Sequence, residues 1–423
     1  MMTGYLDYFG YAVALFAAAA AALGLLFMVR RNQMETAFAR AQADAFQKRV
    51  SLELDRAQQV WQRELRTWDG YRKFEVADIV DEALDVRSVY LRPRDGKLLP
   101  PFKAGQHLAF RFNVPGHDKP VIRCYSLSDA PTDLTRYRIS VKRQGPPPGN
   151  PDAPPGVGSN YVHSLEVGDL LDVRAPGGSF FLPPESDHPI VLLAGGVGLT
   201  PMLSMLNYVA DNNQQRETWL FFGIRNKTEH MFADHLRAVA AQNENVTIVN
   251  VYGRPSDQCV EGHDYQATGY VSADLLKDML PSLNYDFYMC GPPPMMASLY
   301  EGLQGFGVPE SRLHFEAFGP ASVKKTAPPP APAANAPADG IEVIFARSSK
   351  TVTWKGDNQS LLELAEEHGV AMSFGCRAGS CGECATAIKD GNIRYLTEPG
   401  FTPEAGSCLA CCSVPDGRVI IDA

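Results

Sequence analysis

The stretch PIVLLAGGVGLTPM at residues 189–202 determines the fold of the central part of the chain. Residues 190–194 are uniformly apolar, which is typical of a strand buried on both faces. Gly195, Gly196 and Gly198 follow, and a helical pattern of apolar residues begins at Leu199. A strand, a glycine-rich turn and a helix in that order predict a pyrophosphate site, because the helix N-terminus offers free N–H groups.

The segments on either side of this stretch have different patterns of apolar residues. Downstream, the apolar segments at 219–225, 246–253 and 286–291 alternate with helical patterns, which predicts a doubly wound α/β domain with a parallel sheet over residues 187–320. Upstream, short alternating segments such as FEVADIV (74–80) and HLAFRFNV (107–114) are separated by turn residues. These predict an antiparallel β-barrel over residues 71–186.

Chemistry-bearing residues lie at the ends of the predicted strands. In RCYS (123–126), the arginine can bind a phosphate, the tyrosine ring can stack on a flavin and the serine hydroxyl can bond its reactive edge. GVGSN (156–160) offers backbone and hydroxyl donors for flavin phosphates. CGPPPM (290–295) follows the last buried strand of the α/β domain, and EAF (316–318) closes that domain.

Six motifs in a fixed order, RCYSLSDAP, ISVKR, GVGSNYV, GGVGLTPM, CGPPPMM and HFEAFGP, make residues 71–320 resemble the ferredoxin–NADP reductase superfamily. Within it, the chain is most similar to the flavohaemoglobin-reductase-like branch. The resemblance implies a flavin-binding barrel followed by a nicotinamide-nucleotide domain. It also implies that Ser126, Cys290 and Glu316 surround the contact between nicotinamide and flavin, as catalytic residues, and that Phe318 is the terminal aromatic that covers the flavin ring.

The resemblance and the motifs together give a set of cofactor-binding candidates. For the flavin and the nucleotide these are Arg123, Tyr125, Ser126, Val141, Lys142, Gly156, Val157, Gly158, Ser159, Phe318, Gly195, Gly196, Gly198, Thr200, Pro201, Arg225, Arg254, Cys290 and Gly291.

Two features leave the choice of cofactors open. A proline-laden insertion at 144–156 departs from the family pattern beside the phosphate-binding segment, and we expect FAD there in preference to FMN. Arg254 in VYGRPSD can meet the 2′-phosphate of NADPH, yet such GRP segments also occur in relatives that use NADH. The sequence favours NADH and leaves NADPH open.

The C-terminal part carries a cysteine pattern. Residues 321–338 form a Pro/Ala-rich tract without periodicity, which predicts a semi-rigid linker. After it, Cys376, Cys381 and Cys384 stand at x4 and x2 spacing in a glycine-rich loop. Thiolates at these spacings hold a plant-type [2Fe–2S] cluster. The residue order resembles plant-type ferredoxin domains, which implies a β-grasp fold over residues 339–423.

Three cysteines compete to be the fourth cluster ligand: Cys408, Cys411 and Cys412. In ferredoxins this ligand commonly stands four residues before a proline near the final strand. Pro415 therefore favours Cys411, with Cys412 as the alternative and Cys408 as the weakest candidate.

The N-terminal region predicts attachment to a membrane. Residues 9–29 hold 21 residues without a charge and end at Arg30 and Arg31. That length spans about 30 Å of hydrocarbon, so residues 1–30 are predicted to be a single transmembrane anchor. Arginines on its C-terminal side predict an inner-membrane protein whose redox domains face the cytoplasm.

Residues 31–70 read as a helical stalk. Phe46, Val50, Leu54 and Trp61 belong to an apolar stripe at steps of three and four. The stripe is short for a coiled coil, so we expect a stalk that packs on its surroundings and leave self-association through it open.

Composition limits the classes of function. With 45% hydrophobic and 21% charged residues, most of the 423-residue chain should form packed cores. A net charge of −9 argues against a nucleic-acid partner. The segment 339–423 has 12 acidic and 7 basic residues, a net charge of −5 that favours a basic docking patch on an acceptor protein.

Together these parts predict a converter of two-electron to one-electron transfer. A nicotinamide gives two electrons as a hydride, a flavin can accept both, and an iron–sulfur cluster carries one at a time. We therefore expect a membrane-anchored NAD(P)H-dependent reductase that feeds single electrons to a monooxygenase, desaturase, ring-hydroxylating dioxygenase or hybrid-cluster protein. The alternatives are a flavin subunit of an NADH:quinone reductase, in which the ferredoxin would precede the flavin domain, and a scaffold with vestigial redox centres.

Overall fold

The computed structural model describes most of the chain after residue 66. The described residues are 23–26, 28, 30–31, 67–68, 70–118, 120–146, 150–212, 215–316, 318, 340–356, 359–375, 377, 379, 382–396, 399 and 401–423. The chain divides into two units, Met1–Arg66 and Thr67–Ala423. Of the described residues, none belongs to a helix long and apolar enough to cross a bilayer. The predicted anchor and stalk lie mostly outside the described residues, and the predicted linker lies entirely outside them.

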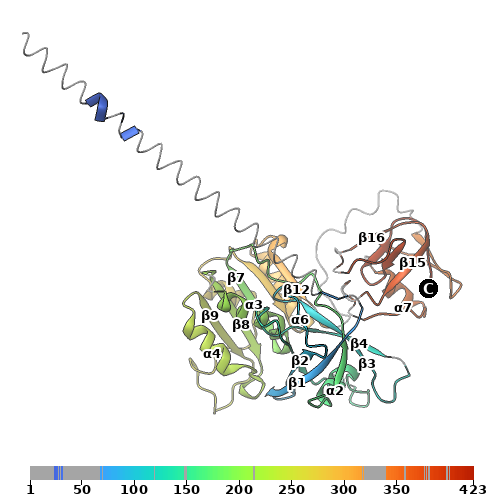
Figure 1. Cartoon of the computed structure of the whole chain (residues 1–423), viewed down its shortest axis with the longest axis horizontal. Helices are drawn as coiled ribbons and strands as arrows, with labels where there is room; N and C mark the ends of the chain where they lie inside the picture. The colour runs from blue at the N-terminus through green and yellow to red at the C-terminus, as the bar shows by residue number, and fades with distance from the viewer. Residues whose placement is uncertain are drawn as a thin grey trace, which may run out of the picture. The chain divides into compact units, whose positions relative to one another are not determined.

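The first domain of the second unit is a six-stranded antiparallel barrel (Figure 1). Its strands are β1 (Arg72–Ala83), β2 (Val86–Pro93), β3 (His107–Phe112), β4 (Val121–Ser126), β5 (Tyr137–Lys142) and β6 (Leu170–Val173). They pair in the order β4-β3-β6-β1-β2-β5. A bridge between Leu127 and Ile139 joins the two ends of this order. Inside, apolar side chains such as Phe74, Phe110 and Tyr137 form the core, and the short helix α2 (Val157–His163) supplies Val162 to it.

The second domain is a parallel sheet with helices on both faces, as predicted. Its strands are β7 (Ile190–Gly195), β8 (Thr218–Ile224), β9 (Val246–Tyr252), β10 (Ala267–Thr268), β11 (Asp286–Cys290) and β12 (Leu313–Glu316), in the order β10-β9-β8-β7-β11-β12. One hydrophobic core contains α3 (Leu199–Asp211) and α4 (Ala233–Gln242). A second core contains α5 (Ala273–Met279) and α6 (Pro293–Gly305). Three single turns, η1 (Gly196–Gly198), η2 (Lys227–Glu229) and η3 (Glu310–Arg312), connect these elements.

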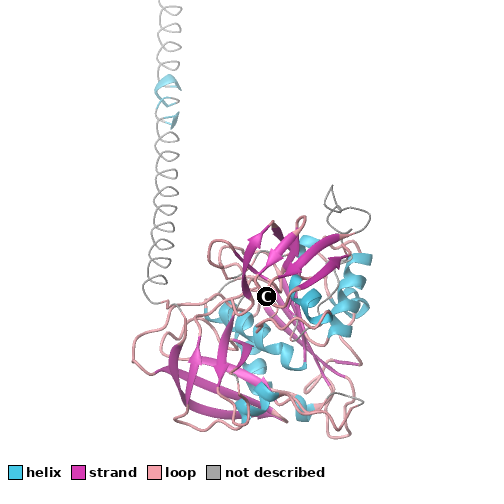
Figure 2. Ribbon diagram, turned by 90° about the vertical axis from the view of Figure 1, so that its right-hand side faces the viewer, coloured by secondary structure: helices cyan, strands magenta, loops and turns pink. Residues whose placement is uncertain are grey.

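The C-terminal domain is a mixed sheet with helix α7 (Leu361–Glu367) packed on it, which agrees with the predicted ferredoxin-like fold (Figure 1). Figure 2 marks the C-terminus of this domain and draws strands in magenta and helices in cyan. The elements are β13 (Ile341–Phe345), β14 (Lys350–Trp354), α7, β15 (Ala385–Asp390), β16 (Ile393–Tyr395), β17 (Ser407–Leu409), β18 (Ser413–Pro415) and β19 (Val419–Ile421). The main sheet has the order β14-β13-β19-β15-β17, in which only β13 and β19 are parallel. Helix α7 begins at a capping box formed by Ser360 and Glu363.

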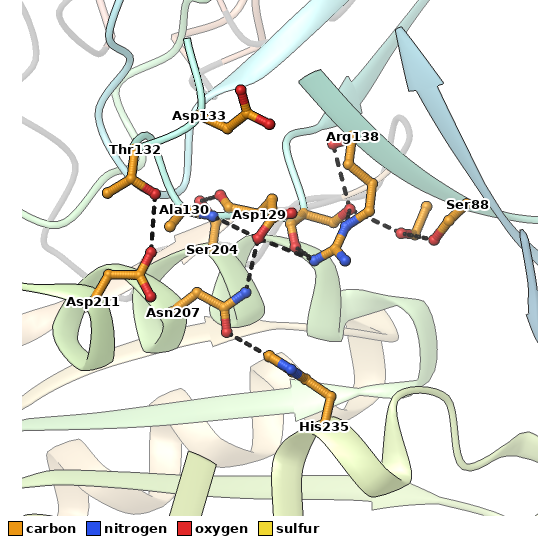
Figure 3. A network of polar contacts seen from close by, with 12 residues as sticks. Ser88, Asp129, Ala130, Thr132, Asp133, Arg138, Ser204, Asn207, Asp211 and His235 are labelled. Carbon is orange, nitrogen blue, oxygen red and sulfur yellow. Dashed lines mark hydrogen bonds and ion pairs between the residues drawn. The ribbon is translucent and has the colours of Figure 1, made fainter. Parts of the chain in front are cut away.

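A polar network joins the barrel to the nucleotide domain (Figure 3). Ser204 and Asn207 of α3 donate to Asp129, which follows β4, over 2.7 and 3.1 Å. Asn207 also bonds the ring of His235 in α4 over 2.8 Å. From the barrel side, Arg138 lies 3.4 Å from the Asp129 carboxylate. The network holds α3, and with it the glycine-rich turn that precedes α3, against the end of β4.

Candidate functional site at the barrel–nucleotide domain junction

Three predicted site residues meet where the barrel faces the nucleotide domain. The Ser126 hydroxyl donates to Glu316 Oε2 over 3.4 Å. Cys290 is fully buried and lies near enough to Glu316 for that carboxylate to act on its ionisation. Residues 126, 290 and 316 thus come together from three strands that are far apart in the sequence.

Strand register brings these side chains together. Ser126, the last residue of β4, is the register partner of His107 at the start of β3. Glu316, the last residue of β12, is the register partner of Cys290 at the end of β11. Both pairs stand at strand ends. The barrel pair, Ser126 and His107, therefore faces the nucleotide-domain pair, Cys290 and Glu316.

His107 is a fourth member of this site that the sequence did not predict. Its Nδ1 lies 3.5 Å from Glu316 Oε1, and the residue is 6% exposed. Gly178, with a φ of +109°, passes so close to the imidazole that a Cβ there would lie 2.9 Å from the ring. The ring is therefore confined, and Glu316 is held between Ser126 and His107. The sequence gives one signal for this role, a histidine at the start of a barrel strand, which is not specific.

Burial determines the charge of the cysteine in this site. Desolvation, followed by the nearby Glu316 carboxylate, raises the pKa of the Cys290 thiol well above its usual value. The thiol is therefore neutral at physiological pH and contributes shape and a weak S–H donor rather than an anion.

The candidate flavin site lies along β4 and the start of α2. The ring of Tyr125 packs on Phe110 and Phe112 with centroids 5.8 and 6.3 Å apart, and burial raises the pKa of its hydroxyl. A Cβ on Gly158 would lie 2.5 Å from Arg123 Cγ and 3.1 Å from the Tyr125 hydroxyl. A larger residue at 158 would displace Arg123, so the glycine keeps this arginine and tyrosine together at the start of the helix. This arrangement fits a flavin phosphate beside Arg123 and a ring on Tyr125.

The remaining flavin candidates have structural contacts of their own. At the start of α2, the Ser159 hydroxyl donates to the Gly156 carbonyl over 3.1 Å and accepts from the backbone N–H of Gln144. Val157 is the first residue of that helix. On β5, Val141 is buried, and the Lys142 ammonium lies 3.6 Å from Glu229. Phe318 is 46% exposed, and its neighbours 317 and 319–339 lie outside the described residues.

The glycines after β7 allow a close approach of two backbone turns. A Cβ on Gly198 would lie 2.1 Å from the carbonyl oxygen of Cys290, and one on Gly195 would lie 2.5 Å from Met295 Sδ. A Cβ on Gly291 would lie 3.1 Å from the Cα and the backbone nitrogen of Gly195. The turns after β7 and β11 therefore pack against each other at the carboxyl edge of the sheet, where nucleotides bind in such folds. This arrangement fits a dinucleotide.

The other nucleotide candidates surround that edge. Gly196 adopts a φ of +54°, and Thr200 and Pro201 lie buried in the first turn of α3, where Thr200 donates to the Val197 carbonyl. Arg225 and Arg254 follow β8 and β9, and the Arg254 N–H donates to the Arg225 carbonyl over 2.7 Å. The Arg225 side chain is 76% exposed and lies 3.6 Å from Glu229.

The described part of the cluster loop favours one fourth ligand. The Gly379 N–H donates to Cys411 Sγ over 3.3 Å, the kind of bond that stabilises a cluster-bound sulfur. The Cys412 thiol donates to the Leu409 carbonyl over 3.6 Å. Cys408 is fully buried in the domain core, and burial raises its pKa to about 11. The chemistry of this donor set fits a cluster held through Cys411.

Two of the predicted cluster ligands cannot be placed. Cys376 and Cys381 lie outside the described residues, whereas Cys384 is described and buried. Within the described part of the chain, no three His, Cys, Asp or Glu residues form a group suited to a metal ion. The four-cysteine site remains a prediction.

The three domains match three families. Residues 76–182 match the oxidoreductase FAD-binding domain, residues 192–300 the oxidoreductase NAD-binding domain and residues 344–416 the 2Fe-2S iron-sulfur cluster binding domain. The chain is therefore an oxidoreductase with domains for FAD, a nicotinamide nucleotide and a [2Fe–2S] cluster.

Individual proteins are similar to a large part of the chain. A flavohemoprotein of Halalkalibacterium halodurans is 39% identical over 255 residues, which are 60% of this chain and 61% of that protein. A flavohemoprotein of Bacillus anthracis is 36% identical over 281 residues, 66% of this chain and 68% of that one. The chain thus spans about two thirds of these relatives. It belongs to the ferredoxin–NADP reductase superfamily, in its flavohaemoglobin-reductase-like branch, and carries a C-terminal [2Fe–2S] domain.

Solved structures agree with this family. The FAD/NAD-binding domain of a nitric oxide dioxygenase from Vibrio cholerae is 34% identical with a TM-score of 0.53, and covers 59% of this chain and all of that chain. Phthalate dioxygenase reductase, at 24% identity and a TM-score of 0.50, covers 84% of this chain and 98% of its own, and shows that the three-domain fold is shared.

Proposed function

We propose that this chain is a membrane-anchored NADH-dependent reductase that delivers electrons one at a time to a partner protein. When bound, FAD would take up a hydride from NADH, and a [2Fe–2S] cluster would carry the two electrons onward singly. The observation that carries the proposal is the meeting of Ser126, Glu316 and Cys290 at the junction of an FAD-binding and a NAD-binding domain.

The residues of the junction would orient and shield the reacting rings. The buried Ser126 hydroxyl and the Glu316 carboxylate, 3.4 Å apart, form a polar edge at the junction. The neutral Cys290 thiol fills the space beside them without adding charge. Hydride transfer needs two rings in close and fixed contact, and this arrangement would exclude water from them.

The N-terminal 30 residues and the acceptor belong to the same proposal. We infer a single anchor at residues 9–29, with the redox domains in the cytoplasm, from the uncharged run and the arginines that follow it. We infer an acceptor with a basic docking patch, such as an oxygenase, desaturase or hybrid-cluster protein, from the net charge of −5 in residues 339–423.

Anaerobic reduction of the purified full-length chain tests the function. We expect NADH to bleach the flavin absorbance first and the cluster absorbance second, and NADPH to do so more slowly. If neither nucleotide reduces the flavin, the enzymatic function is wrong. Carbonate extraction of membranes tests the anchor, because an inserted helix stays in the pellet. Near-stoichiometric co-purification from mild detergent would identify the acceptor.

A further inference from the structure

One acidic residue of the cluster loop contacts the barrel. Glu383 lies between Cys381 and Cys384 in the sequence. Its Oε1 accepts a hydrogen bond from the Tyr71 hydroxyl over 2.8 Å. The same oxygen lies 3.3 Å from Nη2 of Arg174, which directly follows β6 of the barrel.

Aromatic rings from both domains enclose the Arg174 guanidinium. Its centre lies 5.0 Å from the ring centroid of Tyr71 and 5.6 Å from that of Phe401 in the C-terminal domain. Gly382, with a φ of +75°, holds the loop against Phe401, since a Cβ there would lie 2.7 Å from the ring. The Arg174 and Glu383 side chains are 24% and 23% exposed, so water screens this pair less than a surface ion pair.

Charge and protonation both favour this contact. Lys73 and Arg111 on the same part of the barrel are paired with Asp172, over 2.8 and 3.1 Å, whereas Arg174 pairs with the other domain. Arg111 also stacks on the Tyr71 ring at 4.3 Å. Burial, and then the bond to Glu383, raises the pKa of Tyr71 to about 12, so the hydroxyl keeps its proton and can donate it.

We propose that the barrel surface formed by Tyr71, Arg111 and Arg174 is the docking surface for the cluster loop, and that Glu383 anchors the loop there. The proposal rests on the proposed function, because docking would serve the passage of single electrons from the flavin domain to the cluster domain. The occupant is a segment of this chain: the described end of the cluster loop, residues 382–384, together with Phe401.

Charge reversal in the full-length chain tests the docking surface. We would compare Arg174→Glu, Glu383→Arg and the double variant by hydrogen–deuterium exchange and by anaerobic stopped-flow reduction with NADH. Arg174→Glu should increase exchange in segments 167–176 and 382–396. It should also slow cluster reduction about tenfold or more, because like charges then face each other, and leave flavin reduction unchanged. The double variant, in which the two charges are exchanged, should return both the exchange and the rate of cluster reduction most of the way to wild type.

A matched control and separate readouts keep the test decisive. Arg92→Glu breaks another ion pair of the barrel, between Arg92 and Glu75, in which the Arg92 side chain is 60% exposed. This variant should change neither the exchange nor the rate of cluster reduction. Because Glu383 lies beside cluster ligands, iron content is measured for every variant, and Arg174→Glu leaves the loop sequence intact.

Three results would decide against the docking surface or separate it from the function. If Arg174→Glu shows the same hydrogen–deuterium exchange and the same rate of cluster reduction as wild type, the proposed docking surface is wrong. Greater exchange without slower cluster reduction would also overturn it, because the contact would then not serve electron transfer. If NADH does not reduce the flavin in wild type, the proposed function fails, and exchange alone decides whether Glu383 docks on Arg174.

Discussion

The junction at Glu316 and the contact at Glu383 are two glutamate sites built in opposite ways. Glu316 meets Ser126 and His107, which are 4% and 6% exposed, and Cys290, which is fully buried. Glu383 meets Arg174 in a pair of which roughly a quarter of each side chain is exposed. The Glu316 side chain is 15% exposed and the Glu383 side chain 23%, so water reaches the second site more easily than the first.

The origin of each geometry explains the difference. Sheet register fixes each half of the junction, since Ser126 is opposite His107 in the barrel and Glu316 is opposite Cys290 in the nucleotide domain. Side chains fix the second site: Glu383 accepts a hydrogen bond from Tyr71 and pairs with Arg174, whose guanidinium also lies 5.6 Å from the Phe401 ring centroid. Side chains held at strand ends suit a site in which the flavin and nicotinamide rings must meet in the same way in every turnover. A contact made by side chains of two domains suits a cluster domain that binds the barrel and is released from it.

The largest expected effect separates the cluster from the flavin. Cys411→Ser should abolish the [2Fe–2S] cluster while NADH still reduces the flavin, because the loop N–H of Gly379 is directed at Cys411 Sγ. Iron and sulfide content, together with visible absorption, measures this. Cys412→Ser is the control and should keep the cluster, since that thiol bonds a backbone carbonyl. A normal cluster in Cys411→Ser would make this ligand assignment wrong.

The next largest effect is expected at the junction. Glu316→Gln and Ser126→Ala should each slow flavin reduction about 100-fold and leave flavin content unchanged, because positioned proton-active groups typically contribute at least this much. Single-turnover stopped flow at saturating NADH measures it. The two side chains share one hydrogen bond, so the double variant should lose less than the product of the single effects. If Glu316→Gln and Ser126→Ala both reduce the flavin at the wild-type rate, neither residue takes part in the mechanism.

The sequence was sufficient to predict the domains because their patterns are local. The uniformly apolar run at 190–194 predicted a buried parallel strand, and β7 is buried along its whole length. The alternating segment at 107–114 predicted a strand of the antiparallel barrel, and β3 covers its first six residues. Both predictions rest on residues close together in the chain.

The sequence could not predict contacts that depend on two domains at once. His107 carries no motif of its own, and its role follows from lying opposite Ser126 and within 3.5 Å of Glu316, 209 residues later. The pairing of Glu383 with Arg174 is also invisible in the sequence, because either residue alone resembles an ordinary surface charge. Resemblance to a family predicted Ser126 and Glu316 by their motifs, and their 3.4 Å contact needed coordinates.

Substitution of His107 tests whether the junction needs its fourth member. His107→Phe should slow flavin reduction about tenfold, or about 1.4 kcal/mol, because Glu316 loses its imidazole partner in a buried site. His107→Gln keeps an N–H donor near the carboxylate and should recover part of the rate. The comparison of kcat with KM for NADH separates this role from nucleotide binding. An effect confined to KM would contradict a role in positioning Glu316.

The pH dependence of Cys290→Ala should be almost that of wild type. Burial raises the pKa of the Cys290 thiol, so the thiol stays protonated as pH rises through neutrality and its ionisation does not appear in the rate. We expect a loss of about two- to fivefold in flavin reduction, as for a modest packing change near reacting groups, with an unchanged pH profile between pH 6 and 9. If the rate of flavin reduction in wild type rises or falls with pH and this change is lost in Cys290→Ala, the Cys290 thiolate takes part in the reaction.

The response to salt is expected to be as small as the effect of Cys290→Ala, and it distinguishes the two glutamates most directly. Raising sodium chloride from 50 to 500 mM shortens the Debye length to about 4 Å, which weakens a partly exposed ion pair but not a buried one. At saturating NADH, flavin reduction at the junction should therefore change little. Cluster reduction, which depends on Glu383 and Arg174, should fall about two- to fivefold. In Arg174→Glu, salt should instead speed cluster reduction, because it screens repulsion. Equal salt responses of the two steps in wild type would show that the contact at Glu383 contributes no more electrostatic attraction than the junction does.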